Sequence, residues 1–289
     1  MQIIEPVVHD LGDGFSVRRA LPNPRRRMIG PFIFWDHFGP VTLTDTRKLS
    51  VRPHPHCCLA TVTYLFAGEI LHRDSLGNVL AIRPGEVNLM TAGRGIVHSE
   101  RCEPASGETV PTEGIQLWLA LPLALEETEP AFAHYAADAL PRHDAGAVRM
   151  KLIMGECLGL RSPVYCHSPT FYADLSFERE GTAYTLPVAA GHAMGVYVAS
   201  GEVTTNGVAL HAGQLGYLAD EANIAMRAGT RARVLVFGGE PFAEPRHIWW
   251  NFVASDRERI ERAKADWREG RFPAVPGEVE FIPLPDERG

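Results

Sequence analysis

The chain has 289 residues, of which 45% are hydrophobic and 22% charged, the balance of a globular protein with about two domains. Its formal net charge of −7, with no basic run longer than Arg25–Arg27, argues against direct nucleic-acid binding. It has neither an apolar run of the roughly 18–20 residues that a membrane span needs nor a signal-peptide core at its start, so we expect a cytoplasmic protein with no membrane partner.

Short β-like runs bounded by Gly, Pro, Asn and Asp follow one another along most of the chain. They include residues 61–68, 79–87, 115–122, 148–155, 183–191, 194–203 and 233–239. Such runs are typical of an all-β sandwich or barrel. Strands do not alternate with helices in this sequence, which argues against a doubly wound sheet.

A weak internal repeat divides the chain. Residues 63–93 and 196–220 each read as a strand, a Gly-Glu turn, a second strand, a further turn and a third strand. We therefore predict two tandem β-barrels, residues 1–135 and 145–289, joined through the acidic, alanine-rich segment 125–146.

A helix is predicted near the end, at about 256–269. Ser255 and Glu258 have capping-box spacing, and Gly270 follows the periodic run. Ile260, Ala263 and Trp267 recur at helical spacing, so we expect this helix to pack against a barrel.

Two pairs of residues predict a metal site. His54 and His56 are two positions apart, as are His98 and Glu100, and residues at i and i+2 of a strand share a face. Two such pairs on neighbouring strands would supply three imidazoles and one carboxylate. That set leaves open positions on a six-coordinate ion, which a catalytic metal needs.

The chain resembles the pirin family of the cupin superfamily over nearly its whole length. The motifs are HPH, TVTY, HRDSLGN and PGEVNLMTAGRGIVHSE, with PFIFWDHFGP upstream and EPRHIWWNF and RFPAVPGE near the end. The resemblance implies a bicupin whose N-terminal barrel binds a divalent metal, typically iron, with Mn, Ni, Co, Cu or Zn as alternatives. Its ligands would be His54, His56, His98 and Glu100. It also implies a metal-free C-terminal barrel, where His192 has no HxH or His-x-Glu neighbour.

Two positions depart from the family pattern HPH-x-G-(Phe/Ile)-Glu-Thr-Val. Ala60 replaces the glutamate, which removes one candidate acid or base near the metal. Cys58 replaces the glycine, and if the strand continued regularly it would share the face of the histidines, where it could approach the metal or act as an oxidisable neighbour. The alternative is a buried, inert thiol, because the five cysteines show no disulfide pattern and suggest a reducing compartment.

An aromatic segment upstream could supply a substrate pocket. Phe32, Phe34, Asp36 and His37, together with Cys58, are the candidates to line it, since a flat aromatic ligand stacks on apolar rings. The alternative is that the aromatic residues form a barrel core. We interpret His72–Asp74 as a hairpin end with local hydrogen bonds, and Gln116 as a packing residue in a β run.

The resemblance implies two functions. Some pirin-like proteins are similar to quercetin 2,3-dioxygenases, which open a flavonol ring with dioxygen and release carbon monoxide. Here a metal would bind the 3-hydroxyl of a small aromatic substrate, and Glu100 would act as the general base. The alternative is a non-enzymatic redox sensor or transcriptional coregulator that acts through a protein partner, with which an acidic surface is compatible. A metal with a purely structural role is a third hypothesis.

Overall fold

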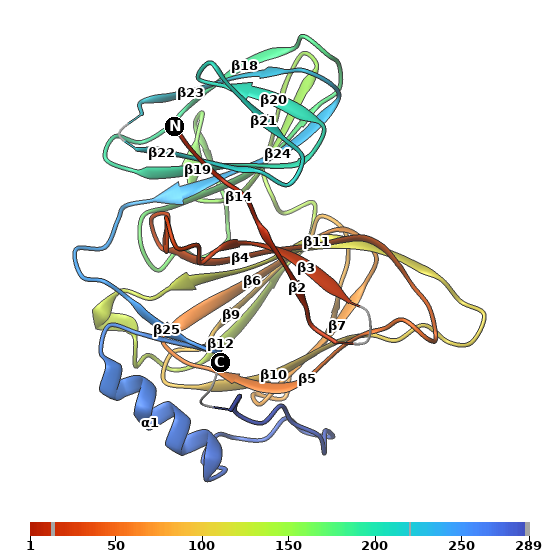
Figure 1. Ribbon diagram of the computed structural model, residues 1–289, viewed down its shortest axis with the longest axis vertical. Helices are drawn as coiled ribbons and strands as arrows, with labels where there is room; N and C mark the ends of the chain where they lie inside the picture. The colour runs from red at the N-terminus through yellow and green to blue at the C-terminus, as the bar shows by residue number, and fades with distance from the viewer. Residues whose placement is uncertain (13–14, 220, 287–289) are drawn as a thin grey trace. The chain divides into compact units, whose positions relative to one another are not determined.

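The computed structural model describes residues 1–12, 15–219 and 221–286. The regular structure in these residues is almost entirely β-strand, with one α-helix, α1 (Arg257–Arg268), and a short 3₁₀ turn, η1 (Leu123–Leu125) (Figure 1). The all-β prediction is therefore confirmed. We find no helix in this part of the chain with the length and hydropathy of a membrane span.

The contacts divide the chain into two compact units, neither of which is one continuous stretch. Unit 1 comprises Met1–Val8, Arg18–His37 and Tyr135–Phe242, and unit 2 comprises His9–Val17, Phe38–His134 and Ala243–Gly289. These bounds differ from the predicted 1–135 and 145–289. The first 37 residues contribute to both units, and the segment with α1 groups with the first barrel. An internal repeat locates barrel strands but gives no information on where the flanking segments pack.

Unit 2 is built on two facing sheets. A four-stranded sheet has the order β5-β10-β7-β8, and a seven-stranded sheet has the order β12-β9-β6-β11-β4-β3-β2, of which β2, β3, β4 and β12 also contribute residues to unit 1. The strands are β2 (Val7–Asp10), β3 (Ser16–Leu21), β4 (Phe32–Leu43), β5 (Leu49–His56), β6 (Leu59–Ala67), β7 (Ile70–Asp74), β8 (Val79–Ile82), β9 (Val87–Thr91), β10 (Ile96–Cys102), β11 (Val110–Ala120) and β12 (Ala131–Tyr135). Leu49 and Ile70 of one sheet share a hydrophobic cluster with Phe38 and Leu65 of the other.

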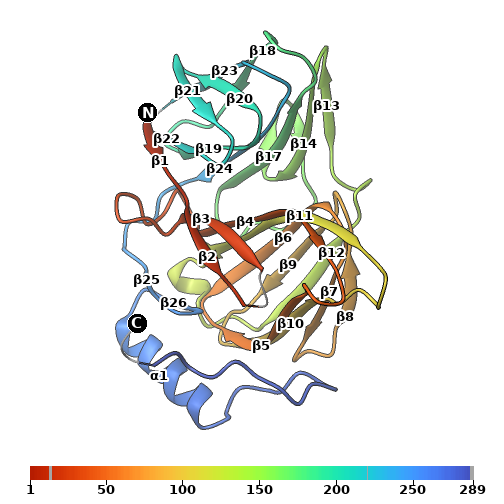
Figure 2. The same ribbon diagram turned by 45° about the vertical axis from the view of Figure 1, so that its right-hand side comes forward.

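Unit 1 has a second pair of sheets (Figure 2). Their orders are β1-β22-β19-β24-β17-β14-β13 and β18-β23-β20-β21, and a separate hairpin joins β15 to β16. The strands are β1 (Gln2–Ile4), β13 (Arg142–Ala145), β14 (Val148–Met154), β15 (Glu156–Cys157), β16 (Leu160–Arg161), β17 (Thr170–Phe177), β18 (Ala183–Pro187), β19 (Ala193–Ser200), β20 (Glu202–Thr205), β21 (Val208–His211), β22 (Leu215–Ala219), β23 (Asn223–Ala228) and β24 (Ala232–Gly239). In β23, Ile224, Met226 and Ala228 are buried and alternate with exposed residues, the pattern of a strand with one face on a core.

The C-terminal segment packs within unit 2. The strands β25 (His247–Trp249) and β26 (Phe252–Ala254) precede α1, and Ile260 and Ala263 of α1 are buried in one cluster with Cys57, Cys58 and Phe252. That cluster confirms the predicted packing of this helix on a barrel.

The predicted capping box of α1 is wrong. Asp256 is the N-cap, and its side chain accepts the Glu258 N–H at 3.0 Å. The hydroxyl of Ser255 donates instead to Glu126 at 2.8 Å. Both serine and aspartate are good caps, so sequence alone did not separate adjacent candidates. Gly270 follows the helix with a φ of +68°, as a C-terminal glycine commonly does.

Candidate metal centre

His54 and His56 lie on β5, an edge strand of the four-stranded sheet, and both side chains are buried. β5 pairs antiparallel with β10, which places His54 opposite His98 and His56 opposite Ile96. The two predicted pairs therefore do lie on adjacent strands, and three of their four members meet inside unit 2.

Two backbone carbonyls fix the tautomers of His54 and His56. Nδ1 of His54 lies 2.9 Å from the carbonyl of Arg52, and Nδ1 of His56 lies 3.0 Å from the carbonyl of Asn251. Because a carbonyl only accepts, Nδ1 carries the proton in each ring and Nε2 keeps a free lone pair. This is the arrangement in which the other ring nitrogen is ready to bind a metal.

His98 completes a converging group of nitrogens. Its Nε2 is 3.1 Å from Nε2 of His56, and its buried Nδ1 has no hydrogen-bond partner among the residues that the structure describes. One ring nitrogen from each of His54, His56 and His98 lies within 4.8 Å of the others. Nitrogens that bind one ion at about 2.1 Å and at right angles are about 3 Å apart. The three side chains therefore fit a single divalent cation.

Burial keeps the three rings neutral. Desolvation lowers the pKa of His54 to about 4. Desolvation, with the neighbouring imidazoles as a smaller cause, lowers the pKa of His56 and of His98 well below the ordinary value. A neutral ring binds a cation without first losing a proton, so the group is ready to bind a metal near pH 7.

Glu100 is placed differently from the histidines. The ladder shifts register between His98 and Glu100, so that Glu100 pairs with Val51. Its carboxylate accepts hydrogen bonds from Nε2 of Gln116 at 3.2 and 3.3 Å, and it does not belong to the converging group. Desolvation raises the pKa of Glu100, although His72, Gln116 and Thr63 act against the shift. Its role as a fourth ligand stays a prediction.

Comparison with known proteins shows the family of this chain. The chain matches the pirin family model over residues 14–119 and the model of the pirin C-terminal cupin domain over residues 172–273. It is 44% identical to a pirin-like protein of Caulobacter vibrioides over 96% of both chains. The chain belongs to the pirin family.

Two further relatives extend this pirin assignment. A Pseudomonas aeruginosa protein that is provisionally named as a quercetin 2,3-dioxygenase is 39% identical, over 90% of this chain and 81% of its own. The crystal structure of a quercetin 2,3-dioxygenase from Acinetobacter baumannii is 35% identical and matches with a TM-score of 0.90, covering 100% of this pirin and 96% of that chain. The predicted bicupin fold is confirmed.

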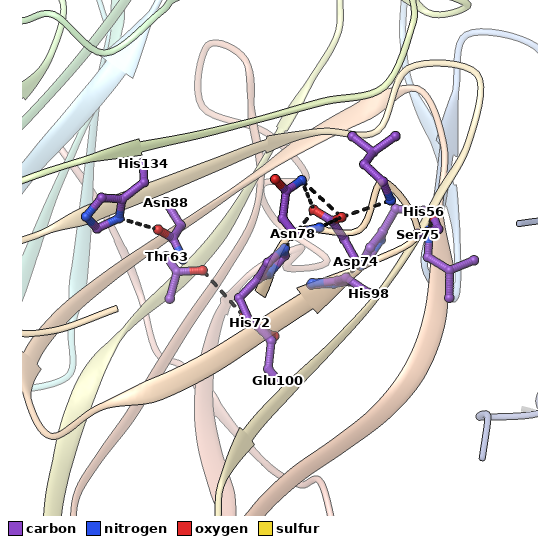
Figure 3. A network of polar contacts seen from close by, with 12 residues as sticks. His56, Thr63, His72, Asp74, Ser75, Asn78, Asn88, His98, Glu100 and His134 are labelled. Atoms are coloured by element: carbon purple, nitrogen blue, oxygen red, sulfur yellow. Dashed lines mark hydrogen bonds and ion pairs between the residues drawn. The ribbon is translucent and has the colours of Figure 1, made fainter. Parts of the chain in front are cut away.

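His72 lies in the interior of this pirin and makes contacts in addition to the local hairpin hydrogen bonds that were predicted for it. It is buried, stands opposite Glu100 in the ladder, and its ring centroid is 5.4 Å from that of His98 (Figure 3). Its Nε2 pairs with Asp74 at 3.0 Å. Burial alone would raise the pKa of Asp74, but hydrogen bonds from His72 and Asn78 lower it. The i, i+2 spacing of His72 and Asp74, the same rule that paired His54 with His56, could have identified this dyad.

Gln116 makes polar contacts that its predicted role as a packing residue did not include. Its amide donates to Glu100 as described, and its Oε1 accepts the hydroxyl of Thr63 at 2.6 Å. Trp118, two positions along β11, forms a T-shaped contact with the ring of His56 at a centroid distance of 5.0 Å. The face of β11 that carries Gln116 and Trp118 therefore contacts the predicted ligand set. A glutamine between the buried Ile115 and Leu117 was the available signal.

Replacing Gln116 with leucine is expected to weaken metal binding by about 10- to 100-fold, the usual effect of losing a hydrogen bond to a ligand. Without the amide, the Glu100 carboxylate loses both hydrogen bonds that Nε2 of this residue donates. Competition with a chelating dye measures the affinity. Gln214→Leu is the matched control, because Gln214 also donates to a glutamate, Glu5, but on the surface of unit 1. Equal affinities for the two variants would contradict a role for Gln116.

The predicted pocket residues of β4 have partners of their own within unit 1. Phe32 is fully buried with its ring against Phe237, at a centroid distance of 4.8 Å. Asp36 forms a bidentate pair with Arg19, whose guanidinium also covers the ring of Phe34 at 4.3 Å. His37 lies 2.9 Å from the hydroxyl of Tyr197. For Phe32 these contacts favour the core alternative, and the pocket role of the other three stays a prediction.

Cys58 does not continue the face of the histidines. β5 ends at His56, and Cys58 has a φ of +59°, so the regular strand on which its predicted position depended is absent. Its side chain is buried in the apolar cluster beneath α1. Cys57 and desolvation raise the pKa of the Cys58 thiol, which makes it a poor thiolate. These contacts favour the alternative of a buried, inert thiol.

Proposed function

We propose that this pirin is a metal-dependent oxygenase of the quercetin 2,3-dioxygenase type, with iron as the metal and a flavonol or similar small aromatic compound as the substrate. The observation that carries the proposal is the convergence of three neutral imidazole nitrogens, with the half-buried, hydrogen-bonded carboxylate of Glu100 two positions beyond His98 on β10. The Acinetobacter and Pseudomonas relatives support the reaction class.

His54, His56 and His98 would hold the metal through ring nitrogens. When bound, a divalent metal supplies Lewis acidity and a template for the adjacent oxygens of a flavonol. Imidazole ligands accept Fe, Ni, Cu and Zn, so the protein environment and metal supply decide between them. Three imidazole ligands and one carboxylate ligand would leave two positions of an octahedral site open for substrate.

Glu100 is proposed to receive the proton of the flavonol 3-hydroxyl. A general base works best when its pKa lies near the working pH, and desolvation moves the pKa of Glu100 upward in that direction. Both of its oxygens accept from Gln116, yet a carboxylate has about four lone-pair positions, so it keeps acceptor capacity. The amide of Gln116 would hold the carboxylate in place while it takes the proton.

Apolar rings line the same interior. The ring of Phe132 stacks on His72 at 4.4 Å, and Trp118 contacts His56. Such surfaces exclude water, which protects a reactive substrate anion from side reactions and strengthens nearby electrostatic interactions. They also suit a flat aromatic substrate.

The test is turnover of quercetin. Protein freed of metal is loaded with Fe²⁺ without oxygen, mixed with quercetin, and then exposed to dioxygen. We expect loss of quercetin absorbance and about one equivalent of carbon monoxide per quercetin consumed. Parallel samples with Mn, Ni, Co, Cu and Zn identify the metal that supports the reaction, and metal-free protein is the control.

Absence of carbon monoxide with every metal would overturn the proposed activity. If the metal still bound tightly, that result would favour the alternative of a metal-bearing sensor or coregulator. The version of this alternative in which Cys58 is oxidised is disfavoured by its burial and raised thiol pKa.

A further inference from the structure

The segment that follows α1 contacts the strands that carry the metal-binding histidines. We call residues 277–286 the strap. Glu278 of the strap accepts the Ser99 hydroxyl at 2.8 Å and pairs with Arg101, with Nη2 at 2.6 Å and Nε at 3.3 Å. Its side chain is only 7% exposed. Ser99 and Arg101 alternate with His98 and Glu100 along β10, so the strap binds the opposite face of the same strand.

The strap also contacts β5. The N–H of Ile282 donates to the carbonyl of Pro53 at 2.8 Å, directly before His54. β5 is the edge of its sheet, and edge strands have unpaired backbone groups. The carbonyl of Ile282 accepts Nε1 of Trp267 at 3.0 Å, which ties the strap to α1. One short segment therefore holds both strands at the residues next to the ligands.

We infer that the strap is a positioning element of the metal centre, with Glu278 and Ile282 as its positioning residues. The inference rests on the proposed metal site. Neither residue would touch the metal or substrate. Glu278 fixes the outer face of β10 on either side of Glu100, and Ile282 fixes the carbonyl before His54. A metal site needs its ligands held to within about 0.5 Å, and a bulged edge strand is a poor support by itself.

The structure offers a control within the strap. Glu280 also approaches Nη2 of Arg101, at 3.5 Å, but its side chain is 56% exposed and Ser99 bonds to Glu278. If charge near Arg101 were all that mattered, substitution of either glutamate would have a similar effect. If the strap positions β10, only substitution of Glu278 should matter.

The experiment is titration with Co²⁺, followed by its visible absorption, for the parent protein and for Glu278→Ala, Glu278→Gln, Glu280→Ala and Ile282→Pro. We expect Glu278→Ala to weaken Co²⁺ binding by about 10- to 100-fold and to change the absorption bands. Glu278→Gln keeps an acceptor for Ser99 and should fall between the parent and the alanine variant. Ile282→Pro removes only the N–H donor and should also weaken binding. Glu280→Ala should match the parent.

Unchanged affinity and absorption bands in Glu278→Ala or Ile282→Pro would overturn the inference, as would equal losses in Glu278→Ala and Glu280→Ala. Urea unfolding of the metal-free variants shows whether each is folded. If the parent itself bound no Co²⁺, the metal centre and the inference would both be overturned. If the parent bound Co²⁺ but did not turn over quercetin, the proposed reaction would fail while the inference stood.

Discussion

Replacing His56 with alanine is expected to abolish metal binding and flavonol cleavage while the protein stays folded. His56 holds its Nε2 3.1 Å from that of His98 and has its tautomer set by Asn251. Without it only two imidazoles remain. The loss of a hydrogen bond to a ligand weakens metal binding by about 10- to 100-fold, and the loss of a ligand itself should weaken it by more. Elemental analysis and carbon monoxide release measure the two effects.

Near-ultraviolet circular dichroism reports whether the His56→Ala variant keeps its tertiary packing. His211→Ala is the control, because His211 is an exposed histidine of unit 1 whose ring pairs with Glu202. It should leave metal content and turnover unchanged. Global unfolding of His56→Ala would support the third hypothesis, a structural metal, and normal metal content would contradict the centre as described.

Replacing Phe32 with alanine is expected to lower the free energy of unfolding by about 3–5 kcal/mol, the range for a fully buried phenylalanine. Its ring packs on Phe237, which stacks in turn on Trp35 at a centroid distance of 4.0 Å. The variant would leave a cavity among these rings. Metal affinity and the KM for quercetin should not change. Urea denaturation measures the stability.

Phe281→Ala is a comparison for this cost, since Phe281 is 57% exposed and should lose far less stability. A small loss of stability in Phe32→Ala together with a raised KM would contradict the core assignment. That result would instead support the predicted role of Phe32 in the wall of a substrate pocket.

The sequence was sufficient to predict the fold class and the convergence of the three histidines, because both depend on strand alternation. Runs such as residues 194–203 gave the strands, and the i, i+2 rule brought His54 and His56 onto one face. The same rule applied to His72 and Asp74 would have found the dyad, but the following Ser-Leu-Gly-Asn turn favoured a local interpretation. Gln116 was missed because an isolated glutamine in a strand gives no information on which side chain it will meet.

The predictions for Cys58 and Ala60 differ from the structure in the strand face on which each residue lies. Cys58 was placed on the histidine face by extending β5, whereas its positive φ ends the regular geometry. Ala60 was treated as the loss of an acid near the metal. It lies on β6, where Thr61 and Thr63 share the face toward Trp118 and Gln116, and alternation puts Ala60 on the other face. A glutamate at position 60 would point away from Gln116 and Glu100.

The register shift in β5 has a consequence for reading alignments of pirins. Between His98 and Glu100 the partner strand advances three residues, from His54 to Val51, while β10 advances two. Within this bulge the carbonyl of Arg52 orients His54 and the carbonyl of Pro53 receives the strap. A homologue with a one-residue gap between Val51 and His54 would restore an uninterrupted ladder and reverse the facing of the residues before the gap. Such a chain would keep every aligned histidine but lose either the residue whose carbonyl orients His54 or the one whose carbonyl receives the strap, so gaps here are more informative than substitutions.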